Sequence, residues 1–295
     1  MAVNHIPGSR YQDHVYAAWA VYNGSTTKIR VAVTRDRGQT FSKAVTITKP
    51  NQTGPTNEYV YPAVDAAGNV YVSVASDHPS PDQKMIYVAR SSDDGVTWSD
   101  FVPVAQASQV PGCCLPNTTF RDGILQHFAA SPDHPGHLYT VWEDWDGSQF
   151  DVKFSQSIDF GRTWSSPIIV NDNTDRAASD QFQPQVAAGP GGAVAVTSTT
   201  AAPPARTIQA FCPSTSGGGT SASTCRCRRS RMGATAPCVE RAFIGDYFGL
   251  ASSKGNVYTL AVSTHYPSDV IADNGGSVYY QQQVLETVAR AALGI

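Results

Sequence analysis

Chemically capable side chains stand in pairs where four β-rich runs of the sequence begin. The pairs are Glu58 and Tyr59, Arg121 and Asp122, Asp180 and Gln181, and Asp246 and Tyr247. A carboxyl group acts as an acid or a base, a tyrosine acts as a nucleophile, and an arginine holds an anionic group. Together these groups are what the hydrolysis of a glycosidic bond requires. An alternative is that the aspartates hydrogen-bond to strand ends and that the tyrosines pack as ordinary aromatic residues.

We predict catalytic roles for one set of these residues and substrate-binding roles for another. The catalytic set is Glu58, Tyr59, Asp122, Asp246 and Tyr247, and the substrate-binding set is Arg121, Asp180 and Gln181. The two sets act together only if the fold brings the starts of the four runs to one place.

The elements that carry these residues are short β-strands in a repeated order. Each unit has a run such as 15–22, then a run such as 28–34, and then a run such as 43–48, all rich in Val, Tyr, Thr and Trp. Gly, Asp, Asn and Pro bound the runs, which is typical of strands joined by hairpins. A further run opens each later unit, at residues 59–66, 124–131, 182–189 and 247–253.

An eight-residue phrase, S/T-x-D-x-G-x-T-W/F, stands at residues 34–41, 91–98 and 157–164. Its Asp can accept hydrogen bonds from N–H groups of a turn, its Gly supplies a positive φ, and its aromatic residue packs back on the sheet. The phrase therefore predicts a hairpin clasp between the third and fourth strands of each unit. We predict a structural and not a catalytic role for its fixed residues, which are Asp36, Gly38, Asp93, Gly95, Asp159 and Gly161.

Four strands per unit and about five visible units predict an all-β fold, a β-propeller of four-stranded antiparallel blades around a central channel. Residues 1–295 form one such domain. The first strand of each blade lines the channel, so the paired residues at the entrances of these strands converge on one spot. Residues 2–23 read as the tail of one strand, a turn and a full second strand, so we expect a domain that is truncated at its N-terminus.

At the three phrases the chain resembles the Asp-box (BNR repeat) proteins, which are sialidase-like β-propellers. The resemblance covers about residues 13–196 and 243–285, and it includes the stretches DQFQP and FIGDYFGLA. It implies a bacterial, secreted propeller, six blades in an intact relative, and a glycoside hydrolase of the exo-α-sialidase type. In that type the nucleophile is a tyrosine, here Tyr59 or Tyr247. The alternative is a non-catalytic propeller that binds glycans or proteins.

Two departures from the sialidase pattern bear on activity. The F/Y-R-I-P-like motif that sialidases carry near their N-terminus is missing from the sequence. Sialidases also use three arginines for the sialate carboxylate. Outside residues 198–233, Arg121 is the one arginine at a predicted blade entrance, while Arg35, Arg37 and Arg162 belong to the clasps.

The segment 198–233 breaks the pattern. It holds five Arg and three of the six Cys, with no Asp and no Glu. One interpretation is a basic linker that binds an acidic partner, and a second is a flexible surface insertion. We favour a third, a shifted reading frame, which would remove the middle of the fourth blade.

The totals exclude several classes of protein. With 24 Gly, 19 Pro and 15% charged residues the sequence is that of a turn-rich globular protein. No apolar run is long enough to span a membrane, and the start lacks a signal peptide. We nevertheless expect an extracellular or periplasmic protein, because propellers of this type are exported. We expect a monomer that binds a glycan or glycoconjugate and no nucleic acid, without a metal or another cofactor.

Overall fold

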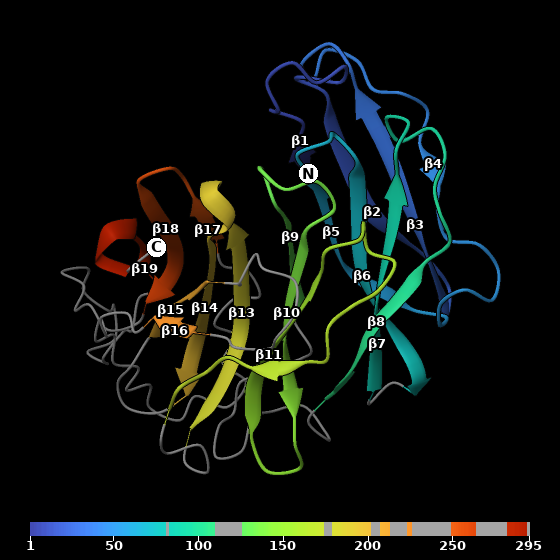
Figure 1. The fold of residues 1–295 in the computed structure, drawn as a ribbon. Coiled ribbons are helices and arrows are strands. Elements are labelled where there is room, and N and C mark those ends of the chain that lie inside the picture. Colours follow the sequence, from blue (N-terminus) through green and yellow to red (C-terminus); the bar gives the residue numbers. More distant parts are fainter. Residues whose placement is uncertain are drawn as a thin grey trace, which may run out of the picture.

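The computed structural model describes residues 1–80, 83–109, 126–173, 179–201, 207–212, 223–225, 249–263 and 282–293. These residues form an all-β fold of five antiparallel sheets, which follow one another from the blue N-terminal sheet to the red C-terminal sheet (Figure 1). Two short 3-10 turns, η2 (Pro190–Gly192) and η3 (Arg290–Leu293), are the helical elements of the described residues. None of these helical elements has the length and apolar composition of a membrane span.

Each sheet is built from strands that are consecutive in the sequence, and we number the sheets as blades one to five. Blade one contains β1 (Ala2–Val3), β2 (Val15–Asn23), β3 (Thr26–Thr34) and β4 (Val45–Thr46). Blade two contains β5 (Asn57–Val64), β6 (Val70–Ser80), β7 (Gln83–Ser91) and β8 (Val102–Ser108). Blade three contains β9 (Gln126–Ala130), β10 (Leu138–Trp145), β11 (Phe150–Ser157) and β12 (Ile168–Ile169).

The last two blades continue this order. Blade four contains β13 (Asp180–Ala188), β14 (Val194–Ala201), β15 (Thr207–Cys212) and β16 (Ser223–Cys225). Blade five contains three described strands, β17 (Gly249–Ser252), β18 (Asn256–Ser263) and β19 (Gln282–Ala289). Strands β15 and β16 come from the segment that breaks the sequence pattern. The described residues of this segment thus add two short strands to blade four. The shifted reading frame, and the loss from blade four that it would cause, stay predictions.

The first strands of the blades lie next to one another, since β5 contacts β9, β9 contacts β13, and β13 contacts β17. Apolar side chains fill the space between neighbouring blades. Ile29 and Val31 of blade one, for example, pack with Val72, Val74 and Tyr87 of blade two. Radial packing of sheets around a row of first strands is the architecture of a β-propeller. The predicted fold class, an all-β sialidase-like propeller with about five visible blades, is confirmed.

The three repeated phrases form three turns with the same hydrogen bonds. In each turn the hydroxyl of the first residue accepts the N–H of the glycine, over 2.8 Å from Gly38, 2.9 Å from Gly95 and 3.0 Å from Gly161. The Asp carboxylate accepts the backbone N–H and the hydroxyl of the threonine that follows it four residues later. These bonds favour the charged form, so Thr40 and Thr34 lower the pKa of Asp36 to about 2.

The residue between the Asp and the Gly of each phrase is left-handed, with φ of 59° at Arg37, 64° at Asp94 and 66° at Phe160. In the second and third clasps this middle residue reaches back to the preceding blade. The Asp94 carboxylate accepts hydrogen bonds from His14, Tyr16 and Arg35 of blade one. The Phe160 ring lies under the guanidinium of Arg90 of blade two, 4.5 Å from the ring centroid. The clasps thus join blades as well as strands.

Candidate functional site

The turns of the blades gather at two ends of the strands. Because successive strands run in opposite directions, the three clasps lie at the same end as the β5–β6, β9–β10 and β13–β14 turns. We name this end the clasp face. The other end, which we name the hairpin face, holds the β2–β3, β6–β7 and β10–β11 hairpins and the starts of β5, β9, β13 and β17.

Four of the eight predicted site residues lie in described strands, and all four are at the hairpin face. Glu58 and Tyr59 are at the start of β5, and Asp180 and Gln181 begin β13. Strand β9 lies between these two strands and contacts both. The other four, Arg121, Asp122, Asp246 and Tyr247, lie outside the described residues. The entrances of two first strands on either side of β9 therefore carry the described half of the predicted site.

Glu58 is part of a cluster that also contains Asp77 and Lys84. The Lys84 Nζ atom lies 3.1 Å from Glu58 Oε2 and 2.7 Å from Asp77 Oδ1. The side chain of Lys84 is 8% exposed, and those of Glu58 and Asp77 are 30% and 17% exposed. Burial of Lys84 disfavours its charge, but the hydrogen bond that Lys84 donates to Asp77 and the charge of Glu58 outweigh this effect and raise the pKa of Lys84.

The segment that precedes β5 passes close to Asp77. Thr56 Oγ1 donates to Asp77 Oδ2 at 2.6 Å, and the Asp77 N–H donates to the Thr56 carbonyl at 3.1 Å. A Cβ atom at Gly54 would lie 1.8 Å from the Asp77 carbonyl oxygen, so the passage requires glycine at this point. The connection before β5 thereby holds Asp77 beside the entrance of the strand.

Sequence analysis did not find Asp77 and Lys84, because they lie in the second and third strands and not in the first. They pair with each other across the β6–β7 hairpin. The available signal was an acidic residue and a basic residue at matching positions on the two sides of a predicted hairpin.

Strands β5 and β13 carry the same bulge near their starts. In β5 one extra residue stands between Glu58 and Tyr61, and in β13 one stands between Phe182 and Gln185. Each bulge holds a left-handed residue, Tyr59 with φ of 52° and Gln183 with φ of 50°. A left-handed residue other than glycine costs about 1–3 kcal/mol, and such strain gathers at functional sites. The bulges also set the register, so that Glu58 corresponds to Phe182 and not to Asp180.

Buried side chains from blade three hold both bulges. Gln126 Nε2 donates to the Tyr59 carbonyl at 3.0 Å, and the Gln183 N–H donates to Glu143 Oε2 at 2.7 Å. Gln126 and Glu143 are both 0% exposed. Sequence analysis missed Glu143, because nothing in the run LYTVWED distinguishes a buried carboxylate from a solvated one.

Asp180 is a buried carboxyl group whose pKa is raised. It is 8% exposed, and its Oδ1 accepts the Phe150 N–H at 2.8 Å. Burial raises the pKa of Asp180, and the charges of Asp146 and Asp151 add to this, while the Phe150 N–H acts in the opposite direction. Gln181 is 2% exposed and its Oε1 accepts the hydroxyl of Ser198 at 3.2 Å.

The raised pKa of Asp180 predicts a pH dependence of stability. The folded state binds this proton more tightly than the unfolded state, in which the pKa is about 3.9, so the contribution of Asp180 to stability is lost as pH rises through the raised value. We expect Asp180→Asn, which keeps the acceptor for the Phe150 N–H, to gain stability relative to the wild type between about pH 4 and pH 8. Urea unfolding of both proteins across this range measures the difference.

Asp36→Asn is the matched control for this experiment. Its pKa of about 2 lies below the ordinary value, so the wild type should gain stability over the variant as pH rises from about 2 to about 4. Parallel pH profiles for the wild type and Asp180→Asn would contradict the assignment of Asp180.

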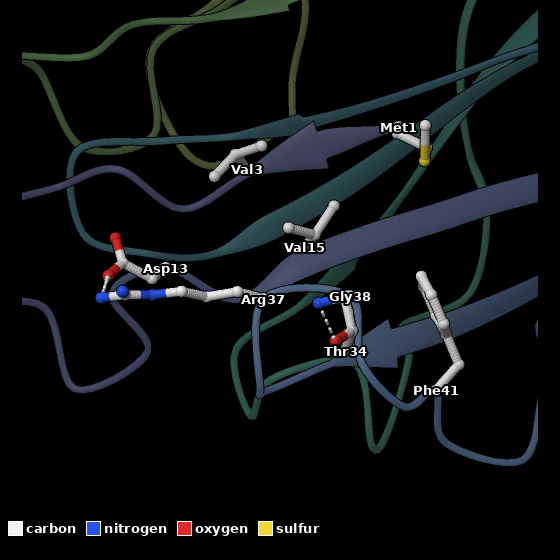
Figure 2. A pocket seen from close by; sticks show the side chains of 8 residues that line it. All are labelled: Met1, Val3, Asp13, Val15, Thr34, Arg37, Gly38 and Phe41. Carbon is white, nitrogen blue, oxygen red and sulfur yellow. Dashed lines mark hydrogen bonds and ion pairs between the residues drawn. The ribbon is translucent and has the colours of Figure 1, made fainter.

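A separate hollow lies on the clasp side of blade one, and Figure 2 shows its lining. Its volume is about 460 Å³, and the residues around it are Met1, Val3, Asp13, Val15, Thr34, Arg37, Gly38 and Phe41. The one carboxylate among these residues, that of Asp13, is bound by Arg37 Nη2 at 2.8 Å. No predicted site residue lines the hollow, so the chemistry of the described residues points to the hairpin face instead.

Comparisons with known proteins bear on the fold. The sequence matches no protein-family model and no curated protein. The structure is similar to that of an α-L-arabinanase of Penicillium chrysogenum complexed with arabinobiose, with a TM-score of 0.53 and 13% identity over 90% of this chain and 75% of that one. The fold is that of the propeller-type glycoside hydrolases.

Two further similar structures are those of a sialidase and of an α-L-arabinofuranosidase. A Hadza microbial sialidase has a TM-score of 0.49 and 15% identity over 86% of this chain, which spans 51% of that protein. A GH93 α-L-arabinofuranosidase of Fusarium graminearum, in complex with arabinobiose, has a TM-score of 0.48 and 14% identity over 92% of this chain and 77% of that one.

Proposed function

We propose that this chain is a glycoside hydrolase whose substrate binds at the hairpin face of the propeller. The observation that carries the proposal is the cluster of Glu58, Asp77 and Lys84 at the entrance of β5. The fold shared with an arabinanase and the two bulges at the same entrances support it. We also propose that the three clasps are Asp-box repeats and that the protein is an exported monomer.

The cluster provides two carboxylates at a suitable separation. Because Glu58 and Asp77 contact one nitrogen atom at 3.1 and 2.7 Å, the contacting oxygens lie no further apart than these two distances together. Retaining glycosidases keep their two carboxyl groups about 5–5.5 Å apart, whereas inverting enzymes need about 6.5–9.5 Å. Because Glu58 and Asp77 share Lys84, the separation that decides the mechanism is the one between Glu58 and the carboxyl group that acts as the acid.

The described residues suggest separate roles in such a mechanism. Glu58, the most exposed of the three cluster residues, is the candidate to attack the anomeric carbon or to activate water there. Lys84 fixes the positions of both carboxylates. Asp180, whose raised pKa keeps it protonated to higher pH, is the candidate to protonate the departing oxygen. Tyr59 and Tyr247 stay predicted nucleophiles of the sialidase type.

Replacement of Glu58 tests the proposal. We expect the wild type to hydrolyse at least one member of a panel of aryl glycosides, and Glu58→Gln to lower kcat on it by about 100-fold or more, because a positioned acid, base or nucleophile contributes at least this much. Asp100→Asn is the control: Asp100 forms an exposed ion pair with Lys49, away from the hairpin face, and the variant should keep wild-type kcat. Unfolding curves of both variants separate a loss of activity from a loss of structure.

The alternative function is a propeller that binds glycans or proteins without catalysis. Its signature would be binding on a glycan array together with no turnover of any glycoside. Equal kcat values for the wild type and Glu58→Gln would remove Glu58 from the mechanism.

A further inference from the structure

Trp145 is an accessible aromatic residue at the hairpin face. It is the last residue of β10, directly before the β10–β11 turn. The other residues of β10 are buried, whereas Trp145 is partly exposed. Sites for small molecules are typically lined by aromatic side chains beside a few polar groups. The surroundings of Trp145 therefore decide whether it can bind part of a substrate.

The alternation of side chains along β10 places Trp145 on the side of blade three that faces blade four. Trp142 and Asp144 contact blade two. Val141 packs in a core cluster with residues of blade four, and Glu143 accepts a hydrogen bond from that blade. Successive side chains of a strand point to opposite faces of the sheet, so Trp145 shares the side of Val141 and Glu143.

Phe150 connects Trp145 with Asp180. The two aromatic residues pair across the β10–β11 hairpin, and their ring centroids lie 5.3 Å apart at an interplanar angle of 62°. Phe150 is 0% exposed, and its N–H donates to Asp180 Oδ1 at 2.8 Å. One buried residue thus contacts both the indole and the carboxyl group that we propose as the acid.

The elements around Trp145 hold it in place. The turn that follows it is ordered by Asp146, whose Oδ1 accepts the N–H groups of Ser148 and Gln149 at 2.9 and 3.0 Å. The Asp146 N–H donates to the Gln149 carbonyl at 3.1 Å. The edge contact with Phe150 fixes the indole from the other strand. A side chain that is already ordered loses little conformational freedom when a ligand binds.

We infer that Trp145 stacks against the ring of the leaving group, a sugar or an aryl group, in a subsite beside Asp180. The C–H groups on one face of a sugar ring are apolar, as is an aryl ring, so either ring buries apolar area on the indole. The inference rests on the proposed function and names the residue that holds the leaving group.

The positions of the proposed catalytic groups indicate which ring meets Trp145. The attacking group, Glu58, belongs to β5, and the acid, Asp180, belongs to β13, with β9 between these strands. The departing oxygen lies at Asp180, so the ring attached to it extends away from Glu58. It then reaches the junction of blades three and four, where Trp145 stands.

The first test compares two substrates that share one sugar. One is an aryl glycoside that the wild type hydrolyses, and the other is the glycosyl fluoride of that sugar, whose leaving group has no ring. We expect Trp145→Ala to lower kcat/KM by at least about 10-fold for the aryl glycoside and by less than about 3-fold for the fluoride. Trp145→Phe keeps an aromatic ring and should recover most of the loss.

Trp19→Ala is the matched control, because Trp19 is an exposed tryptophan in the middle of β2 in blade one. This variant should keep the wild-type kcat/KM for both substrates. A loss of equal size on the aryl glycoside and on the fluoride in Trp145→Ala would give Trp145 a purely structural role and would overturn the inference.

The second test measures binding without turnover. The chain has five tryptophans, and each indole N–H gives one signal in a ¹⁵N NMR spectrum. The signals of Trp145 and Trp19 are those missing from Trp145→Phe and from Trp19→Ala. In titrations with aryl glycosides, lactose and cellobiose, we expect the Trp145 signal to shift with at least one ligand and the Trp19 signal to stay in place. Methyl glycosides, whose leaving group has no ring, should shift the Trp145 signal less.

The outcomes separate this inference from the proposed function. A shift at Trp145 with no turnover of any glycoside would remove the proposed function and keep Trp145 as a residue that binds a ring. Turnover of aryl glycosides with no shift at Trp145, and with wild-type kcat/KM in Trp145→Ala, would overturn the inference and keep the function. Neither a shift nor turnover would overturn both.

Discussion

Replacing Trp142 by alanine is expected to lower the free energy of unfolding by about 3–5 kcal/mol, the range for a buried Trp or Phe truncated to alanine. Trp142 is 0% exposed in β10 and packs with Ile86 and Ala107 of blade two. Truncation removes the apolar area of the indole from the interface of two blades and leaves a cavity that rigid sheets fill poorly. Equilibrium unfolding in urea measures the loss.

Trp19 provides an unusually close control for this prediction. It is the fifth residue of β2, as Trp142 is of β10, and it lies opposite Arg30 as Trp142 lies opposite Lys153. Its exposure, however, is 37%, because the described residues place no blade on that side of blade one. We expect Trp19→Ala to cost less than about 1 kcal/mol. Similar losses for the two variants would contradict the role assigned to blade packing.

Removing the carboxylate of Asp94 is expected to cost about 1–3 kcal/mol, the range for a buried donor left without its acceptor, because the Arg35 side chain that also loses its partner is 46% exposed. Asp94 is 5% exposed and accepts hydrogen bonds from His14 Nδ1 at 2.8 Å, from the Tyr16 hydroxyl at 2.8 Å and from Arg35 Nε at 2.7 Å. Asp94→Ala leaves these donors at the blade interface without their acceptor. It also places alanine at a φ of 64°, which alanine adopts less readily than aspartate.

Asp94→Asn separates charge from geometry in this experiment. Asparagine tolerates the left-handed conformation and keeps an acceptor, so its loss should be smaller than that of Asp94→Ala. Burial alone would raise the pKa of Asp94, but the hydrogen bonds from His14, Tyr16 and Arg35 outweigh it and lower the pKa. The stability that the charge contributes is therefore present above pH of about 3.9 and is lost as pH falls through the lowered value.

Urea unfolding of the wild type and Asp94→Asn should accordingly converge in acid. A difference that stays constant from neutral pH to about pH 2 would assign the effect to packing and not to the carboxylate.

Local patterns in the sequence were enough to predict the fold. The clasp depends on residues within eight positions of one another, and strand composition depends on still shorter windows, so the order of strands and blades could be read directly. Blade four was the exception, since its last two strands lie in a segment whose composition resembles neither strand nor clasp.

The site depends on residues that are far apart in the sequence, so a short sequence window does not include all of them. Glu58 was predicted because it opens a first strand, but Asp77 and Lys84 join it only through the register of the β6–β7 hairpin. The bulges near the starts of β5 and β13 decide which residues of the two strands occupy equivalent positions. No residue type in the sequence predicts these bulges. Trp19 and Trp142 show the same limit, because similar local sequences acquire opposite exposures from what packs on them.

The second and third clasps each contact the preceding blade, and this has a consequence for how the blades assemble during translation. The middle residue of the second clasp contacts blade one, and that of the third contacts blade two, so each reaches toward a part of the chain synthesised earlier. Each sheet is also made of consecutive strands. A ribosome releases the chain from the N-terminus onward. A blade that leaves the ribosome thus meets a surface that already exists, and its clasp can close before any later blade has been synthesised.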